Sequence, residues 1–133
     1  MAKELIKVTD GKMSFGDYEL SAKAKLDGFE FGGNIYKVKT FKELTKLEKD
    51  EMFLYESEPG TNVYDWTQTD KELSFNVEGC EDAMITIGLK EDTEYEVFEN
   101  GVSAGKVKTN LGGKLSISVS LSEGKAVNIR IAL

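Results

Sequence analysis

The chain has no histidine and only one cysteine, Cys80, among its 133 residues. Without histidine, Ser-His-Asp and Cys-His nucleophiles, imidazole acid–base catalysis and histidine metal ligands are excluded. A single cysteine cannot form a disulfide within the chain, which fits a reducing compartment. The acidic neighbours Glu81 and Asp82 disfavour a reactive thiolate, so we interpret Cys80 as a structural or incidental thiol.

The chain also lacks long apolar runs and an excess of positive charge. No run approaches the roughly 18 apolar residues of a membrane span, and the charged start "MAKELIKVTDGK" has no apolar core of signal-peptide length. Lysine and arginine number 17 against 24 acidic residues, a formal charge of −7 that argues against nucleic acid and anionic membranes as partners. We therefore expect a cytoplasmic protein, unless a leader has been removed or export follows a non-standard route.

Alternation of apolar and polar residues dominates the C-terminal half. It occurs in "KELSFNV" (71–77), "AMITIGL" (83–89), "KLSISVSL" (114–121) and "AVNIRIAL" (126–133). Within "EYEVFENGVSAGKVKT" (94–109), Asn100-Gly101 supplies the two positive-φ positions of a type I′ turn, which indicates a hairpin. About six short strands with regular turn signals predict an antiparallel β-sandwich-like half.

The N-terminal half is β-rich but less regular. Residues 4–20 read as short strands that are broken at Asp10-Gly11 and Gly16-Asp17. Residues 40–48 are ambiguous, because a capping-box pattern starts at Thr40 and the apolar residues that follow have helical spacing. We favour one short helix there and a strand over 52–57, with a hairpin that turns at residues 49–51 as the alternative.

The predicted fold is therefore mainly β, with at most one short helix. We divide the chain into a β-rich N-terminal subdomain, residues 1–64, and an immunoglobulin- or fibronectin-like subdomain, residues 65–133. The segment "PGTNVYDWTQTD" (59–70) is the best junction between them.

Three aromatic residues near this junction form a candidate glycan site. Tyr55, Tyr64 and Trp66 lie close together in the sequence, and aromatic rings exposed on a β-surface stack on sugars in many carbohydrate-binding modules. We favour the simpler interpretation that Trp66 fills the seam between the halves, where its bulk buries the most area. The missing signal peptide also counts against a glycan binder, because most are exported.

Carboxylates are abundant, but their spacing matches no catalytic or metal motif. The turns on either side of residues 83–89 carry Glu78, Glu81, Asp82, Glu91, Asp92 and Glu94. Oxygen-rich turns can bind Ca²⁺, yet the EF-hand pattern is absent and acidic turns usually serve solubility. A glycosidase pair also needs a cleft that a small β-protein rarely encloses. We expect no cofactor, and the sequence leaves Ca²⁺ binding open.

One face of the strand over residues 114–122 consists of serines. Leu115, Ile117, Val119 and Leu121 share one face, and Ser116, Ser118, Ser120 and Ser122 share the other. The simplest interpretation is a solvated outer face. The alternative is a flat interaction surface, because lysines or glutamates there would block another sheet.

Nearly the whole chain resembles a family of short proteins from anaerobic Gram-positive bacteria. The resemblance lies in "ELIKVTDGKMSFGDYEL", "YKVKTFKELTKLEKDEMFLYESEPGT" and "DTEYEVFENGVSAGKVKTNLGGKLSISVSL". Members tend to carry an endosialidase-like label. Sialidase chemistry usually relies on several arginines that grip the sialic carboxylate, and this chain has only Arg130, so the resemblance implies no such activity.

Together these observations predict a non-enzymatic structural or interaction protein that binds copies of itself, as a dimer or a larger and even filamentous assembly. A free terminal strand can add to the sheet edge of a neighbouring molecule. The candidate self-association residues are Leu5, Ile6, Lys7, Val8, Ser116, Ser118 and Ser120. A carbohydrate-binding module that uses Tyr55, Tyr64 and Trp66 is the alternative.

Overall fold

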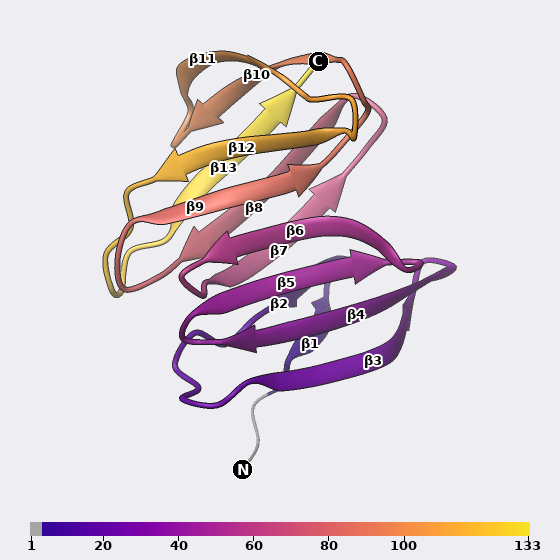
Figure 1. Cartoon of the computed structure of the whole chain (residues 1–133), viewed down its shortest axis with the longest axis vertical. Helices are drawn as coiled ribbons and strands as arrows, with labels where there is room; N and C mark the ends of the chain where they lie inside the picture. Colours follow the sequence, from indigo (N-terminus) through magenta and orange to yellow (C-terminus); the bar gives the residue numbers. More distant parts are fainter. Residues whose placement is uncertain (1–3) are drawn as a thin grey trace.

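The computed structural model describes residues 4–133, which form thirteen β-strands and contain no helix (Figure 1). None of the described residues therefore forms a helix that could span a bilayer. The strands are β1 (Ile6–Thr9), β2 (Lys12–Phe15), β3 (Ala24–Phe31), β4 (Asn34–Phe41), β5 (Leu44–Lys49), β6 (Met52–Glu58), β7 (Asn62–Gln68), β8 (Glu72–Glu78), β9 (Ala83–Gly88), β10 (Glu94–Glu99), β11 (Val102–Lys108), β12 (Lys114–Val119) and β13 (Val127–Ala132).

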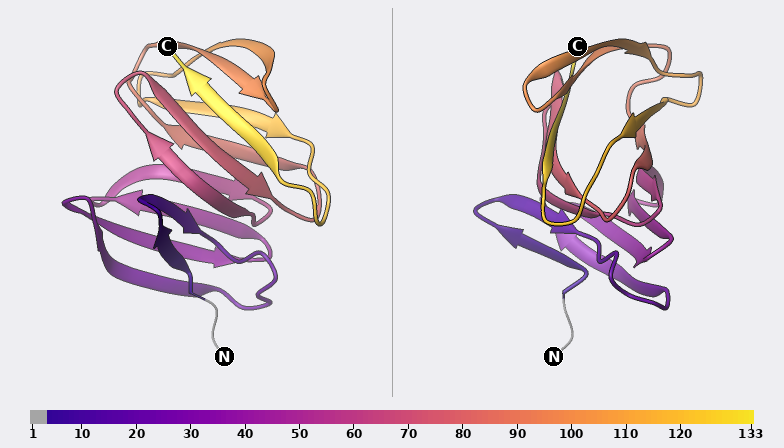
Figure 2. Two further views of the ribbon diagram at one scale, coloured as in Figure 1. Left: turned by 180° about the vertical axis from the view of Figure 1, so that it is seen from behind. Right: turned by 90° about the vertical axis from the view of Figure 1, so that its left-hand side faces the viewer.

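The strands form two antiparallel sheets, which confirms the prediction of a mainly β protein. The seven-stranded sheet has the order β1-β2-β7-β8-β13-β10-β11, and the six-stranded sheet has the order β12-β9-β6-β5-β4-β3. The six-stranded sheet lies in front in Figure 1, and the turned view of Figure 2 shows the sheets as two layers. β1 and β3 therefore lie at one end of the molecule, and β11 and β12 lie at the other.

Both sheets contain strands from both halves of the chain. The seven-stranded sheet joins β1, β2 and β7 to four later strands, and the six-stranded sheet joins β3–β6 to β9 and β12. The boundary between residues 64 and 65 falls inside β7, which pairs with β2 on one side and β8 on the other. One cluster of buried side chains extends through both halves.

The alternation in the C-terminal half predicts its strands well. Leu73, Phe75 and Val77 are buried on β8 as their spacing requires. Asn100 and Gly101, with φ angles of 51° and 81°, form the two-residue loop of the β10–β11 hairpin. The last two strands are not hairpin partners, because β12 pairs with β9 whereas β13 pairs with β8 and β10.

The favoured helix over residues 40–48 is wrong, because this segment is the β4–β5 hairpin. Phe41 pairs with Leu44 across a two-residue turn, and the next hairpin turns at residues 50–51, as the alternative predicted. Thr40 does not cap a helix. Its hydroxyl lies 2.9 Å from that of Thr45 across the hairpin and accepts a hydrogen bond from the backbone N–H of Asp17. Tertiary partners of this kind override a local helical pattern.

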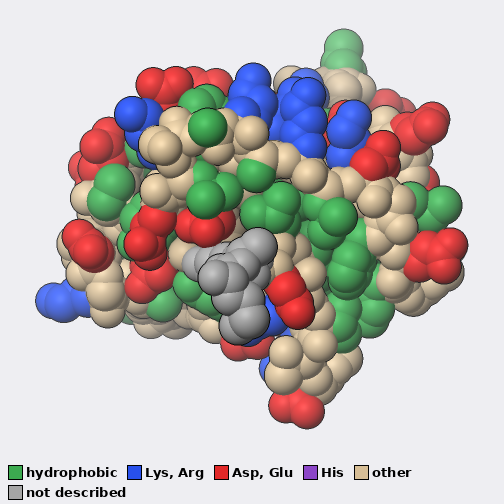
Figure 3. Space-filling view, turned by 90° about the horizontal axis from the view of Figure 1, so that it is seen from below, with side chains coloured by type: hydrophobic (Ala, Val, Ile, Leu, Met, Phe, Trp, Pro, Cys, Tyr) green, Lys and Arg blue, Asp and Glu red, His purple; other side chains and the backbone are tan. Residues whose placement is uncertain are grey.

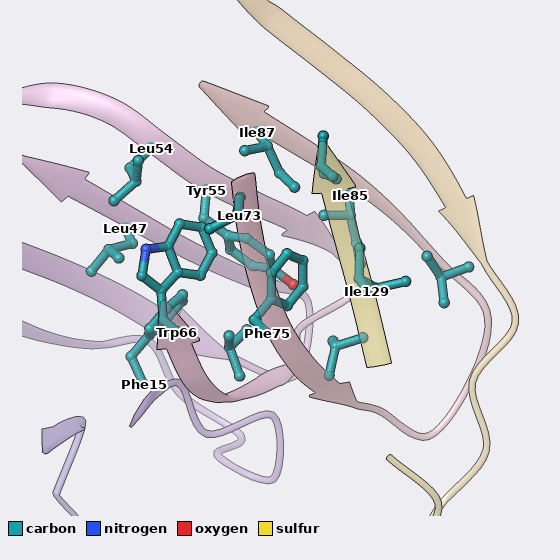
Figure 4. Packing of buried hydrophobic residues seen from close by; sticks show 14 of the residues in the cluster. Phe15, Leu47, Leu54, Tyr55, Trp66, Leu73, Phe75, Ile85, Ile87 and Ile129 are labelled. Atoms are coloured by element: carbon teal, nitrogen blue, oxygen red, sulfur yellow. The ribbon is translucent and has the colours of Figure 1, made fainter. Parts of the chain in front are cut away.

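The two sheets meet at Tyr55, which projects from β6 of the six-stranded sheet into aromatic rings of the other sheet (Figure 4). Its ring centroid lies 5.3 Å from that of Phe15, 6.0 Å from that of Trp66 and 5.8 Å from that of Phe75, each in an edge-on arrangement. Trp66 in turn stacks on Phe75 at 5.1 Å. Such pairs add about 0.5–1.5 kcal/mol each beyond the area that they bury.

Polar side chains next to this aromatic cluster form hydrogen bonds with one another and with the backbone. The Tyr55 hydroxyl lies 2.8 Å from Oγ1 of Thr61, which also lies 2.8 Å from Oγ of Ser57. The hydroxyl of Thr45 donates to the carbonyl of Thr61 and accepts from its N–H. Burial of the Tyr55 phenol raises its pKa far above the ordinary value, so this side chain remains neutral in the folded protein.

A Tyr55→Phe substitution tests this contact. We expect it to lower the free energy of unfolding by about 1–2 kcal/mol at neutral pH, because Thr61 loses a hydrogen-bond partner in the core. In the unfolded wild type Tyr55 ionises near the ordinary tyrosine pKa of 10.0, whereas the folded phenol does not. The wild type therefore loses stability above that pH, and the difference from the variant shrinks. Urea titrations from about pH 7 to about pH 11 measure this, and a constant difference would contradict it.

Candidate functional site

The aromatic residues of the glycan hypothesis do not form an exposed platform. Tyr55 is fully buried and Trp66 is only 6% exposed, so neither ring offers an open face to a sugar. Trp66 contacts rings from both halves of the chain, namely Phe15, Tyr55 and Phe75. The hydroxyl of the half-buried Tyr64 accepts a hydrogen bond from the Asn62 amide and donates one to Glu78. The burial of Tyr55 and Trp66 thus leaves Tyr64 as the one residue of the three with a partly accessible ring.

Several carboxylates of the acidic turns have partners within the protein. Glu78 accepts a hydrogen bond from the Tyr64 hydroxyl, Asp82 accepts one from the backbone N–H of Leu121, and Asp92 lies 3.1 Å from the ammonium of Lys108. Within residues 4–133 no three His, Cys, Asp or Glu side chains converge in a way that could hold a metal ion.

The single arginine and an aspartate beside a surface hollow also have structural contacts. The Arg130 guanidinium lies over the ring of Phe98, 3.9 Å from its centroid, and 3.6 Å from a carboxylate oxygen of Glu72. A hollow of about 570 Å³ on the six-stranded sheet is lined by residues that include Glu48 and Asp50. Asp50 accepts a hydrogen bond from the backbone N–H of Ile35. At least one carboxylate of this hollow therefore has a structural hydrogen bond.

The predicted self-association residues occur in two edge strands. Ile6, Lys7 and Val8 belong to β1, which pairs only with β2, and the half-buried Leu5 precedes it. Ser116 and Ser118 belong to β12, which pairs only with β9, and Ser120 follows directly. Within residues 4–133, each of these strands therefore has one side that pairs with no other strand.

β12 is a regular edge strand. All six of its residues pair with β9 without a bulge. Leu115 and Val119 are buried, whereas Ile117, on the same face, is only half-buried. Ser116 and Ser118 are exposed on the other face, where the Ser116 hydroxyl lies 3.0 Å from that of Thr86 on β9.

A narrow cleft of about 240 Å³ opens between β12 and β11, the edge of the other sheet. Its walls include Val107 from β11, Ile117 and Val119 from β12, and Val97, Ile129 and the acidic Glu99 from the strands behind. The half-buried state of Ile117 and Val107 shows that the core is incompletely covered here. This end of the molecule therefore combines a free strand edge with apolar side chains.

Each of the other three edges has a feature that opposes pairing with another chain. β1 has only four residues and carries Lys7. β11 has a register shift opposite Val97/Phe98 and a positive φ of 105° at Gly105. β3 has a register shift between Leu26 and Phe29.

β3 also borders a cluster of lysines on the outer face of its sheet. Lys25, Lys39 and Lys46 are directly opposite one another on β3, β4 and β5. Lys23 and Lys37 belong to the same cluster, because their charges also act on Lys39. Like-charge repulsion lowers the pKa of Lys39, and Lys25 has the largest effect. Figure 3 shows lysine and arginine side chains gathered along its upper margin, on the side of this sheet. These ammonium groups repel a second copy that approaches in the same orientation.

A Lys39→Gln substitution tests the repulsion within the lysine cluster. We expect the free energy of unfolding to rise at low salt, because the variant removes the ammonium that faces both Lys25 and Lys46. Urea titrations at about 10 mM and about 500 mM NaCl measure the gain, which shrinks as salt screens the charges. Lys7→Gln is the matched control, since Lys7 pairs with Ser14 and faces no lysine. An equal gain in both variants would contradict the repulsion.

The environment of Trp66 gives a second test. Because the indole is buried among other rings, we expect a blue-shifted emission and little quenching by acrylamide in the native state. A panel of glycans should leave the emission unchanged. Strong native-state quenching, or a saturable response to a glycan, would contradict the packing of Trp66.

Comparison with known protein families, with curated proteins and with solved structures gives no match for this chain.

Proposed function

We propose that this protein is a non-enzymatic structural protein that self-associates through an open sheet edge. In this proposal residues 65–133 supply an immunoglobulin- or fibronectin-like β-sandwich part and residues 1–64 a second β-rich part. The observation that carries the proposal is the state of β12, a regular edge strand with uncharged serines on its exposed face and one incompletely covered apolar residue, Ile117. An ordinary soluble sandwich protects such an edge with charge, a bulge or a covering loop.

Pairing of two strand edges supplies the free energy of association through backbone hydrogen bonds and apolar contact. Each backbone hydrogen bond between strands contributes about 1 kcal/mol net, and coverage of Ile117 and the neighbouring cleft adds a hydrophobic contribution. Association costs at least about 4 kcal/mol in lost translational and rotational freedom. Several hydrogen bonds together with apolar contact are therefore needed, and a six-residue strand offers both.

The net charge sets the salt dependence of this association. Each copy carries −7, so two copies repel at long range. The β12 edge itself has no charge between Lys114 and Glu123. Salt therefore screens the repulsion without weakening an ion pair at the contact, and self-association becomes stronger as ionic strength rises.

The native mass in solution tests the proposal. We expect the mass measured by sedimentation or light scattering to rise with protein concentration between about 10 μM and about 1 mM, and to rise further with added salt. A protein that stays strictly monomeric over this range contradicts the proposed function.

A charged variant of β12 tests the edge itself. In the double variant Ser116→Lys/Ser118→Lys we expect the dissociation constant to rise at least about tenfold, which corresponds to about 1.4 kcal/mol. Both serines are exposed, so the melting temperature should change little. The matched control is Val8→Lys/Thr9→Lys, which adds the same charge to β1. If only the control dissociates the assembly, β1 and not β12 is the contact.

A further inference from the structure

The geometry of β12 points to a specific partner and register, and this inference rests on the proposed self-association. We propose that β12 pairs antiparallel with β12 of a second copy across a two-fold axis at Ile117. The two six-stranded sheets then form one continuous sheet.

The partner strand follows from the edges that a second copy offers. β1, β3 and β11 each carry a feature that opposes pairing, whereas all six residues of β12 pair regularly and its exposed face carries Ser116 and Ser118 with one charge, Lys114, at its start. Two strands pair best when both are extended and unbulged over the same length. β12 of one copy therefore fits β12 of another better than it fits the other edges.

The alternation of β12 restricts the register. Residues directly opposite in an antiparallel pair project on the same side of the sheet, so a register that sets a serine against an apolar residue is excluded. With the axis at Ile117, Ser116 faces Ser118 of the second copy, Leu115 faces Val119, and the two Ile117 side chains face each other. Both copies thus keep hydroxyls on the outer face and apolar groups on the inner face.

Two neighbouring registers are less favourable. An axis at Ser116 sets Val119 opposite Gly113. Gly113 has a φ of 78° and is therefore not in the extended conformation that strand pairing needs. An axis at Ser118 sets Leu115 opposite Leu121, which lies beyond the end of β12 at Val119. The axis at Ile117 keeps residues 115–119 of both copies paired within β12.

The half-buried Glu99 of β10 lines the cleft that Ile117 also lines, and the charges on the six-stranded sheet do not oppose this contact. The outward residues of β9 beside β12 are Met84 and Thr86, both neutral. Glu56 and Glu58 lie on β6, so the two β6 strands are separated by about 24 Å, five strand spacings. That distance exceeds the screening length of about 8 Å at physiological salt. Lys114 faces Ser120 of the second copy, and the two lysines lie at opposite ends of the paired strands.

The contact also completes the part of the core that the monomer leaves uncovered. Ile117 is half-buried at the cleft between β11 and β12, and the second copy brings its own Ile117 to the same position. Because the same strand is used on both sides, the contact is isologous and closes on itself. The assembly formed by this edge is thus a dimer.

Site-specific crosslinking tests the partner and the register together. In a Cys80→Ser background, which removes the exposed native thiol, Ser116→Cys and Ser118→Cys chains of different mass are oxidised with glutathione disulfide, separately and mixed. Directly opposite residues lie within the Cα separation that a disulfide needs, about 4.4–6.8 Å, and diagonal ones do not. We expect the mixture to give the 116–118 heterodimer at least about tenfold faster than either chain alone gives a homodimer.

Each other outcome overturns a defined part of the inference. Fast homodimers of Ser116→Cys alone, or of Ser118→Cys alone, place the axis at that residue and overturn the register. A native dimer that forms none of these disulfides overturns pairing through β12 while leaving the proposed self-association intact. A strict monomer at high concentration overturns both.

Discussion

The contact of Tyr55 with the opposite sheet is the interaction on which the rest of the structure depends. The Tyr55 ring contacts the rings of Phe15, Trp66 and Phe75. Three strands of the seven-stranded sheet therefore pack on one side chain of the six-stranded sheet. A phenol at this depth needs a hydrogen-bond partner, which Thr61 supplies at 2.8 Å. The β4–β5 hairpin helps to hold Thr61 in place. The hydroxyl of Thr45 on this hairpin forms hydrogen bonds with both the carbonyl and the N–H of Thr61.

The two sheets have four edge strands. The two ends of the molecule differ in the features that oppose pairing of these edges with another chain. At the β1/β3 end, a short strand, a bulge and a cluster of lysines oppose further pairing. At the other end β11 is irregular but β12 is not. The proposed self-association therefore depends on the position of Ser116 and Ser118 on a regular edge strand. On an inner strand the same serines would only be a wet surface.

The patterns that predicted this fold correctly were short-range ones. Alternation identified β8, β9, β12 and β13, and Asn100-Gly101 identified a hairpin turn because both positions adopt positive φ. Asp10-Gly11, expected as a break between short strands, is the turn of the β1–β2 hairpin. The helix over residues 40–48 was wrong because Phe41, Leu44 and Leu47 fit helical spacing by coincidence. Their segment is extended, and in this form Thr40 and Thr45 find buried partners in each other and in the backbones of Asp17 and Thr61.

The sequence by itself determined the β class, most strand positions, the net charge and the absence of histidine chemistry, because each of these depends on composition or on neighbours a few residues apart. The tertiary structure decided which strands are neighbours, since pairings such as β12 with β9 and β13 with β8 join distant residues. It also decided that Trp66 is buried and that Ser116 and Ser118 lie on an edge. Burial and edge position are properties of the assembled sheets, and no local pattern contains them.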